Sequence, residues 1–322
     1  MILGRTPGHF HHMQHLHSVD AVQLDSSVMT IGMFDGVHIG HQQIMHQMIQ
    51  KSHQINTPSC VITFHPHPAF VLRNLNEPFY LTTPDERAGI LLKYGIDYVI
   101  TLPFNSELSS YPPDKFMRYL NDHLKINHLF IGSDFALGKD RKGDKHALEE
   151  IGRHMGYTIE IVQPLERYDQ KVSSSLIRNV IKRGEIELAA ELLGRKYSIA
   201  GLASTVNDLV TDSEVISCIE MAYDYSKIIP KPGLYAGLAA INDKEYPGFI
   251  ETFPPNPNGN LPNDQYLQVS LFHRRIDFDR KEINVSFLKP IRDPIDFRSN
   301  EEKAIQLKHD FENSKEVFSH VG

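Results

Sequence analysis

Short apolar runs alternate with amphipathic stretches over the first 197 residues. Runs rich in β-branched and apolar residues predict five strands, at 27–34, 59–64, 98–102, 128–131 and 157–162. Apolar positions at helical spacing predict helices at 42–54, 84–94, 113–124, 147–155, 174–182 and 185–193. Thr82 or Thr83 is expected to cap the second helix, with Glu86 in its first turn. This alternation predicts an α/β fold with a parallel, doubly wound sheet.

The pattern changes after about residue 197. Strand-like stretches at 233–241, 265–272 and 282–288 are separated by turns, Asn256–Asn260 is typical of a loop, and 301–316 predicts a terminal helix. These elements predict a small β-barrel-like domain over 198–322, after an α/β domain over 19–197. Residues 1–18 hold five of the 18 histidines. We expect them to form a polar N-terminal extension; the alternative is a metal-binding tract.

Composition narrows the class of protein without indicating its chemistry. The length of 322 residues suits two domains. The sequence shows neither an apolar run long enough to span a bilayer nor the apolar region of a signal peptide. Cys60 and Cys218 are too far apart in sequence to suggest a disulfide framework, so a cytoplasmic location is expected. The net charge is −7, and neither domain has the basic excess of a duplex-binding module, so we expect no nucleic-acid partner. The sequence leaves the oligomeric state open.

Two segments have the composition of phosphate-binding sites. His38-Ile39-Gly40-His41 stands where the first predicted strand meets a helix, and backbone N–H groups at a helix start favour phosphate. Two imidazoles there could donate hydrogen bonds to developing charge; the alternative is a pair of ordinary surface histidines. The segment from Val172 to Arg178 supplies serine hydroxyls and a guanidinium at another helix start. Its alternative is a plain serine N-cap. Together the two segments suit a nucleoside triphosphate.

Two further segments follow predicted strands. The loop Phe64-His65-Pro66-His67-Pro68 is stiffened by prolines and suits a planar ring, although a structural turn explains it equally well. The segment 131–145 mixes basic and acidic residues, so it could meet phosphate or form a solvated face. It follows a strand at the edge where α/β sheets bind ligands.

The order of these motifs resembles that of a known family. The chain contains, in this order, TIGMFDGVHIGHQ, TFHPHP, IGSDFALGKDRKGD, VSSSLIR and AAELLGRKYSIAG. This series, which covers about residues 15–201, resembles the prokaryotic bifunctional riboflavin kinase/FMN adenylyltransferase family, also called FAD synthetase. The resemblance implies an HxGH nucleotidylyltransferase domain of Rossmann-like fold followed by a riboflavin-kinase-like β-barrel. In that family the FMN phosphate attacks the α-phosphate of ATP, with Mg²⁺, to give FAD and pyrophosphate.

The resemblance also implies roles for individual residues. His38, His41 and Arg178 match positions that bind the ATP phosphates and stabilise the transition state. Further positions match the binding site for ATP and the flavin: Gly32, Phe34, Asp35 and Gly40 in the nucleotide loop, Ser173 and Ser174 at the triphosphate, and Phe64, Pro66, His67, Pro68, Asp134 and Phe135 on the flavin side. Met33 and His65 depart from the family pattern. Adenylyl transfer needs mainly positioning and charge stabilisation, and no covalent-catalysis constellation is recognisable in the sequence.

The second domain keeps the outline of a riboflavin kinase but lacks its catalytic residues. Pro232–Ala236 and Val285–Leu288 resemble family strands. The family's GFPTAN segment, which holds Mg-ATP, would fall at 215–220, where the sequence is VISCIE; the Gly-rich loop expected after Gly201 is also missing. Gln268 stands where the family has its glutamate base. We therefore predict that the chain makes FAD but not FMN. The alternatives are transfer to another phosphorylated acceptor, a flavin-binding regulatory paralogue without turnover, and a fully bifunctional enzyme.

Overall fold

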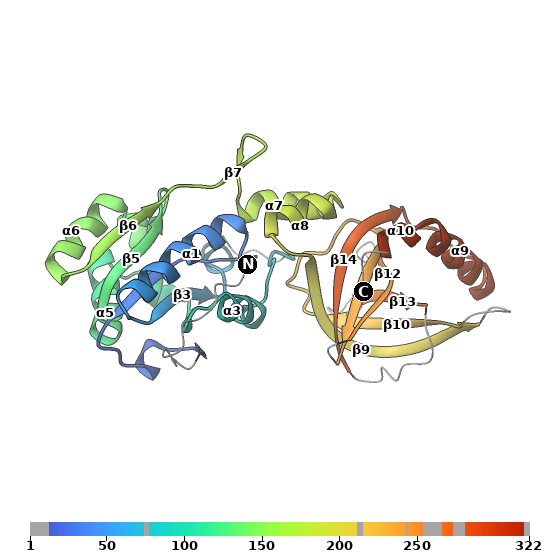
Figure 1. The fold of residues 1–322 in the computed structure, drawn as a ribbon, viewed down its shortest axis with the longest axis horizontal. Helices are drawn as coiled ribbons and strands as arrows, with labels where there is room; N and C mark the ends of the chain where they lie inside the picture. The colour runs from blue at the N-terminus through green and yellow to red at the C-terminus, as the bar shows by residue number, and fades with distance from the viewer. Residues whose placement is uncertain are drawn as a thin grey trace. The chain divides into compact units, whose positions relative to one another are not determined.

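The computed structural model describes the chain as two compact units. It covers residues 13–73, 77–210, 215–242, 244–253, 266–272 and 281–318. The first unit comprises the chain up to Glu77 together with Thr82–Ser173, and the second comprises Pro78–Leu81 together with the chain from Ser174 onward (Figure 1). The domain boundary expected near residue 197 stays a prediction, as does the role of the histidines before residue 13, which lie outside the described residues.

The first unit contains a six-stranded parallel sheet in the order β1-β4-β3-β2-β5-β6. All five predicted strands are present. The strands are β1 (Gln14–Leu16), β2 (Ser27–Ile31), β3 (Ser59–His65), β4 (Tyr98–Pro103), β5 (Ile126–Gly132) and β6 (Thr158–Val162). The central strand β2 is buried along its whole length, as expected of a strand covered on both faces. The predicted α/β architecture is thereby confirmed.

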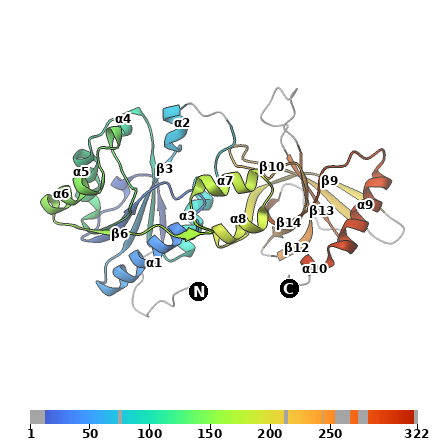
Figure 2. The same ribbon diagram turned by 90° about the horizontal axis from the view of Figure 1, so that it is seen from above.

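Helices cover both faces of this sheet (Figure 2). The four long helices are α1 (Ile39–Gln54), α3 (Pro84–Lys93), α5 (Pro113–Leu124) and α6 (Lys145–Met155); short helical segments are η1 (Val19–Ala21), α2 (Pro68–Arg73), α4 (Ser106–Ser109) and η2 (Lys139–Arg141). Val28 of β2 packs with α1 and α3, whereas the next residue, Met29, packs with α5 and α6. Alternate residues of this strand therefore pack in two different hydrophobic cores, one on each face of the sheet. The Thr83/Glu86 capping box at the start of α3 is also present.

Strand β1 corrects the prediction for residues 1–18. Gln14–Leu16 pair in parallel with Tyr98–Ile100 of β4 and form an edge of the sheet, so the end of the expected extension belongs to the fold. The sequence signal is weak because His15 and Gln14 are polar and the strand has three residues. His15 is nevertheless half-buried, and its Nε2 lies 2.9 Å from Thr101 Oγ1.

The second unit is a closed antiparallel barrel in the order β10-β13-β12-β11-β14-β9, preceded and followed by helices. The three predicted strands are confirmed and three more are found. The strands are β9 (Tyr197–Val210), β10 (Val215–Tyr223), β11 (Gly233–Ile241), β12 (Lys244–Thr252), β13 (Tyr266–Leu271) and β14 (Glu282–Arg292); the helices are α7 (Ser174–Lys182), α8 (Ile186–Leu193), α9 (Asn300–Asn313) and α10 (Lys315–Phe318). The predicted loop Asn256–Asn260 lies outside the described residues. A two-residue hairpin pair, β7 (Glu166–Arg167) and β8 (Gln170–Lys171), belongs to the first unit.

Within the described ranges, no helix combines the length and the apolar character that crossing a membrane requires.

Candidate active site

The sheet order locates the ligand-binding edge of the first unit. The chain proceeds from β2 to β3 and β4 on one side of the sheet and then places β5 and β6 on the other. Its strand order therefore reverses between β2 and β5, and open α/β sheets bind ligands beyond the carboxyl ends of such strands. The nucleotide loop, residues 32–38, follows β2, and the segment with Asp134 and Phe135 follows β5.

The nucleotide loop has an unusual backbone. Phe34, Gly36 and Val37 have φ angles of 48°, 81° and 40°, in the left-handed region. Non-glycine residues there cost about 1–2 kcal/mol each, and such strain is concentrated at functional sites. The loop ends at His38, the N-cap of α1, whose Nδ1 accepts a hydrogen bond from the backbone N–H of His41 at 3.3 Å. In a neutral His38 ring the proton is therefore on Nε2.

The two predicted catalytic histidines lie against each other. The rings of His38 and His41 are stacked with centroids 3.6 Å apart, and the rings of Phe34 and His41 form a T-shaped pair with centroids 5.2 Å apart. Burial, helped by the nearby His38, Arg87 and Lys171, holds the pKa of His41 well below its usual value. His41 is thus neutral at pH 7 and can donate one hydrogen bond. Gly40 permits this packing, because a Cβ there would lie 3.2 Å from His38 Cε1 and Nδ1.

Asp35 is part of a buried polar network that supports the nucleotide loop. Its Oδ1 accepts hydrogen bonds from the N–H and the hydroxyl of Thr82 at 3.0 and 3.1 Å, and Gly36 N–H donates to the same hydroxyl at 3.0 Å. Arg87, fully buried, places Nη2 3.8 Å from Asp35 Oδ1. Asp35 therefore shapes the loop from within the protein, with an exposed fraction of 1%.

Arg87 also joins this network to the predicted flavin loop. Its Nη1 donates to Thr63 Oγ1 at 3.1 Å and to the Phe64 carbonyl at 3.4 Å. Thr63 in turn donates to the carbonyl of Met33 at 3.0 Å. From the sequence, Thr82 was expected only as a possible helix cap, and Arg87 was not predicted as a site residue. The available signal was the charge of Arg87 on the helix face that carries Ala88 and Leu91, which is otherwise apolar.

The predicted flavin loop follows β3, and its aromatic residue is partly structural. Phe64 packs against Phe104 and Phe116 with ring centroids 5.9 and 6.2 Å away. His67 Nδ1 accepts the N–H of Ala69 at 3.0 Å, so this side chain caps α2, which starts at Pro68. Pro66 lies between them in the loop.

In the segment after β5, the two predicted site residues have different environments. Phe135 packs against the apolar core, whereas Asp134 is exposed and forms an ion pair with Lys171 at 2.5 Å. The hydrogen bond from Lys171 lowers the pKa of Asp134. Lys171, another residue that the sequence analysis missed, directly precedes Val172 and Ser173. The carbonyl of Val172 lies 3.8 Å from the Cβ position of Gly40, so this strand end and the start of α1 are close together.

The remaining predicted residues belong to the second unit, in which Ser174 is the first residue of α7. Arg178, buried on α7, donates from Nε to the carbonyl of Phe79 at 2.8 Å. Its guanidinium carbon lies 3.7 Å from the centroid of the Phe79 ring. The structure thus groups His38, His41 and Gly40 with Val172 and Ser173 in one unit and describes Arg178 within the other.

The barrel shows the contacts of the residues predicted to stand at the positions of the kinase residues. Gln268 of β13 stands opposite Glu251 of β12 and Glu220 of β10 in the sheet register. Lys303 of α9 donates to Gln268 Oε1 and, at 2.7 Å, to Glu251 Oε2. Cys218, at a position where the family motif would lie, is 3.5 Å from Ser270 Oγ. These polar side chains therefore form their hydrogen bonds with one another, and Lys303 links α9 to β12 and β13.

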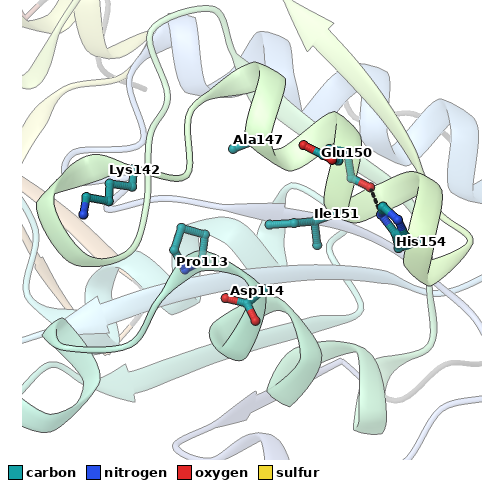
Figure 3. A pocket seen from close by; sticks show the side chains of 7 residues that line it. All are labelled: Pro113, Asp114, Lys142, Ala147, Glu150, Ile151 and His154. Carbon is teal, nitrogen blue, oxygen red and sulfur yellow. Dashed lines mark hydrogen bonds between the residues drawn. The ribbon is translucent and has the colours of Figure 1, made fainter.

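A hollow elsewhere in the first unit lies between α5 and α6 (Figure 3). Its lining residues are Pro113, Asp114, Lys142, Ala147, Glu150, Ile151 and His154. The predicted site residues are not among them. The side chain of His154 forms a hydrogen bond within its own helix, with Nδ1 2.8 Å from the Glu150 carbonyl oxygen.

Comparison with known proteins agrees with this architecture. The family model of FAD synthetase matches residues 20–176, and that of riboflavin kinase matches residues 193–318. A Buchnera aphidicola protein from Schizaphis graminum, named bifunctional riboflavin kinase/FMN adenylyltransferase, is 30% identical over 308 residues, which cover 94% of this chain and 97% of the relative. The chain belongs to the bifunctional riboflavin kinase/FMN adenylyltransferase family.

Other members of the family match over most of their length. The Bacillus subtilis protein is 29% identical and covered to 98%, with 96% of this chain matched. The Pseudomonas fluorescens protein is 31% identical and covered to 87%, with 85% of this chain matched. A crystal structure described as a macrolide-efflux protein from Streptococcus pneumoniae has a TM-score of 0.77 and 23% identity, covering 94% of this chain and 99% of that chain. At that identity it shows the shared fold alone. The family and fold predicted from the motifs are thus confirmed.

Proposed function

We propose that this chain transfers the adenylyl group of ATP to FMN, giving FAD and pyrophosphate, and that it does not phosphorylate riboflavin. The first part is carried by the HxGH pair, which is held at the start of α1 by a strained loop with its own buried support. FMN is favoured as the acceptor by the loop after β3 and the segment after β5. The names of the relatives also support it.

In the proposed reaction a phosphate oxygen of FMN attacks the α-phosphorus of ATP. The bond from that phosphorus to the oxygen bridging to the β-phosphate breaks, and pyrophosphate leaves with its electron pair. FMN supplies the nucleophile, so the protein needs only to align the groups and stabilise charge. His38, His41 and the N-terminal N–H groups of α1 would donate hydrogen bonds to phosphate oxygens. Arg178 would pair with the triphosphate.

We further propose that Mg²⁺ enters with ATP. Mg²⁺ usually keeps several waters and binds through one or two carboxylates together with substrate phosphates. We therefore expect the cation to be held mainly by the phosphates of the nucleotide. When bound it would neutralise phosphate charge.

The loss of kinase activity is supported by Gln268 and its partners. An amide cannot accept the proton of a riboflavin hydroxyl as a carboxylate does. In addition, the ammonium of Lys303 bonds both Gln268 and the buried Glu251, so the polar groups of this region are used to stabilise one another. Ser217, at another position of the missing motif, bonds Asp208 at 2.9 Å.

Product analysis tests both parts of the proposal. The purified full chain is incubated with ATP and Mg²⁺ and either FMN or riboflavin, and the flavins are separated by chromatography, with a bifunctional relative as the positive control. We expect FAD from FMN and unchanged riboflavin. FMN formed from riboflavin at a rate similar to that of the relative would identify a bifunctional enzyme. Flavin binding without FAD formation would identify a regulatory paralogue.

A further inference from the structure

The second unit contains a short segment from the first half of the sequence. Residues Pro78–Leu81, here called the strap, belong to the unit that carries α7 and the barrel. The N–H groups of Phe79 and Tyr80 both donate to the carbonyl of Ser226, at 2.7 and 2.8 Å, and Ile228 N–H donates to the Tyr80 carbonyl at 2.9 Å. The strap is thus hydrogen-bonded to the segment between β10 and β11.

The residues that hold the strap are themselves fixed. Lys227, which is 1% exposed, donates from Nζ to the Ser198 carbonyl at 2.8 Å and pairs with Tyr80 in an isolated parallel bridge. The hydroxyl of Tyr197, the first residue of β9, donates to the Ile228 carbonyl. A buried lysine with a hydrogen-bonded head is costly to move, because its charge would lose that partner. The barrel therefore provides a rigid base for the strap.

Phe79 uses this rigidity to orient Arg178. Its carbonyl accepts the Nε–H at 2.8 Å, and its ring lies under the guanidinium, 3.7 Å from ring centroid to Cζ. One contact fixes an edge of the planar group and the other fixes its plane. Arginine has a long, rotamer-rich side chain, so fixing the guanidinium in advance reduces the ordering needed when an anion binds.

We propose that Phe79 is a positioning residue for Arg178, and that the barrel serves adenylyl transfer by holding Phe79 in place. This inference rests on the proposed function, because it takes Arg178 as a ligand of the ATP phosphates. It assigns a role to a domain that, under the proposed function, has no reaction of its own. The strap also leads directly into Thr82, whose hydroxyl supports Asp35 and Gly36 of the nucleotide loop.

A double-mutant cycle tests the proposal. Phe79→Leu keeps apolar bulk and the backbone carbonyl but removes the aromatic face, whereas Phe79→Tyr keeps that face. Arg178→Lys keeps the charge but removes the planar group that stacks. We expect Phe79→Leu to raise the KM for ATP about fivefold to thirtyfold, with the KM for FMN within twofold and Phe79→Tyr close to wild type. In the Arg178→Lys background, Phe79→Leu should add less than a twofold change.

Controls separate positioning from a general loss of structure. Phe253→Leu removes another half-buried ring of the same unit, which packs on Tyr266, and should leave both KM values unchanged. If Phe79→Leu does not fold, Phe79→Met takes its place in the cycle. The proposal is overturned if the fold-changes that the two substitutions cause in the KM for ATP multiply in the double variant. It is also overturned if the Phe79 variant loses thermal stability while its KM for ATP is unchanged. If the wild-type chain makes no FAD, the proposed function fails, and ATP-binding titrations of the same four proteins decide the inference separately.

Discussion

The two units differ in what their polar side chains do. In the first, Asp35, Thr82 and Arg87 are buried behind the nucleotide loop and hold its strained backbone, and the stacked histidines lie at the end of that loop. In the second, Gln268, Glu251 and Lys303 bond one another. Both units keep the folds of their families, and under the proposed function only the first keeps its catalytic groups. The comparison shows that a barrel needs its apolar pattern, whereas a reaction needs particular side chains at particular positions.

The largest effect is expected from His41 in the first unit. His41→Asn should lower kcat for FAD formation about 100- to 1,000-fold, because under the proposed function it removes an imidazole that donates to developing phosphate charge. The measurement is steady-state formation of FAD from FMN and ATP. His46→Asn, on the exposed side of the same helix, is the matched control and should leave kcat within twofold. A His41 variant that retains most of its activity would remove the main evidence for a catalytic first unit.

A large effect on stability, without one on catalysis, is expected from Lys303 in the second unit. Lys303→Met leaves Glu251, which is 6% exposed, as an unpaired buried carboxylate. We expect a loss of about 2–3 kcal/mol in the free energy of unfolding, somewhat less than for a fully buried pair because the lysine is 17% exposed. Urea unfolding curves measure this loss, and FAD formation by the folded protein should remain within twofold.

Adding Glu251→Gln to Lys303→Met provides the control. The double variant has no buried charge to compensate, so it should recover most of the lost stability. If the single variant is as stable as the wild type, the ion pair is not a structural element. If the single variant folds but no longer forms FAD, the ion pair of the second unit affects catalysis as well as stability, contrary to the prediction.

A smaller, pH-dependent effect is expected from the depressed pKa of His41. In the folded chain His41 stays neutral below pH 6.5, whereas in the unfolded chain it takes up a proton near its ordinary pKa of 6.5. The unfolded state then binds more protons, so stability falls as pH falls below 6.5. Between pH 6.5 and 5.5 the wild type should lose up to about 1 kcal/mol more than His41→Asn. Equal slopes in urea titrations across this range would contradict a His41 that stays neutral in the folded chain.

Much of the first unit was predictable because its signals are local. The β-branched run of β2 and the Thr83 capping box each appear within a few residues of sequence. Strand β9 was missed because polar residues such as Asn207 and Asp208 interrupt its apolar alternation, and a long antiparallel partner, β10, is what makes it a strand. The pairing of strands in the barrel therefore depends on contacts between distant residues, which the local sequence pattern does not reveal.

The candidate site also combines residues in local motifs with residues whose partners are distant in the sequence. The HxGH motif and Arg178 could be proposed as site residues from the sequence because their neighbours form short, ordered motifs. The contact of Asp35 with Thr82 joins residues 47 positions apart, and that of Arg178 with Phe79 joins residues 99 apart. Such partners are set by the fold, so the supporting residues were found only in the structure.

The smallest effect on stability is expected from Asp134. Its ion pair with Lys171 is solvent-exposed, with side-chain exposures of 73% and 43%, so Asp134→Asn should change the free energy of unfolding by less than about 1 kcal/mol. If Asp134 contacts the flavin, as the resemblance implies, the KM for FMN should still rise severalfold while that for ATP changes little. Asp140→Asn is the matched control, since Asp140 lies in the same segment and pairs more loosely with Lys142 at 3.9 Å. Equal KM values for FMN in both variants would show that Asp134 serves only this surface ion pair, and the flavin side of the first unit would then have to be sought at the loop after β3.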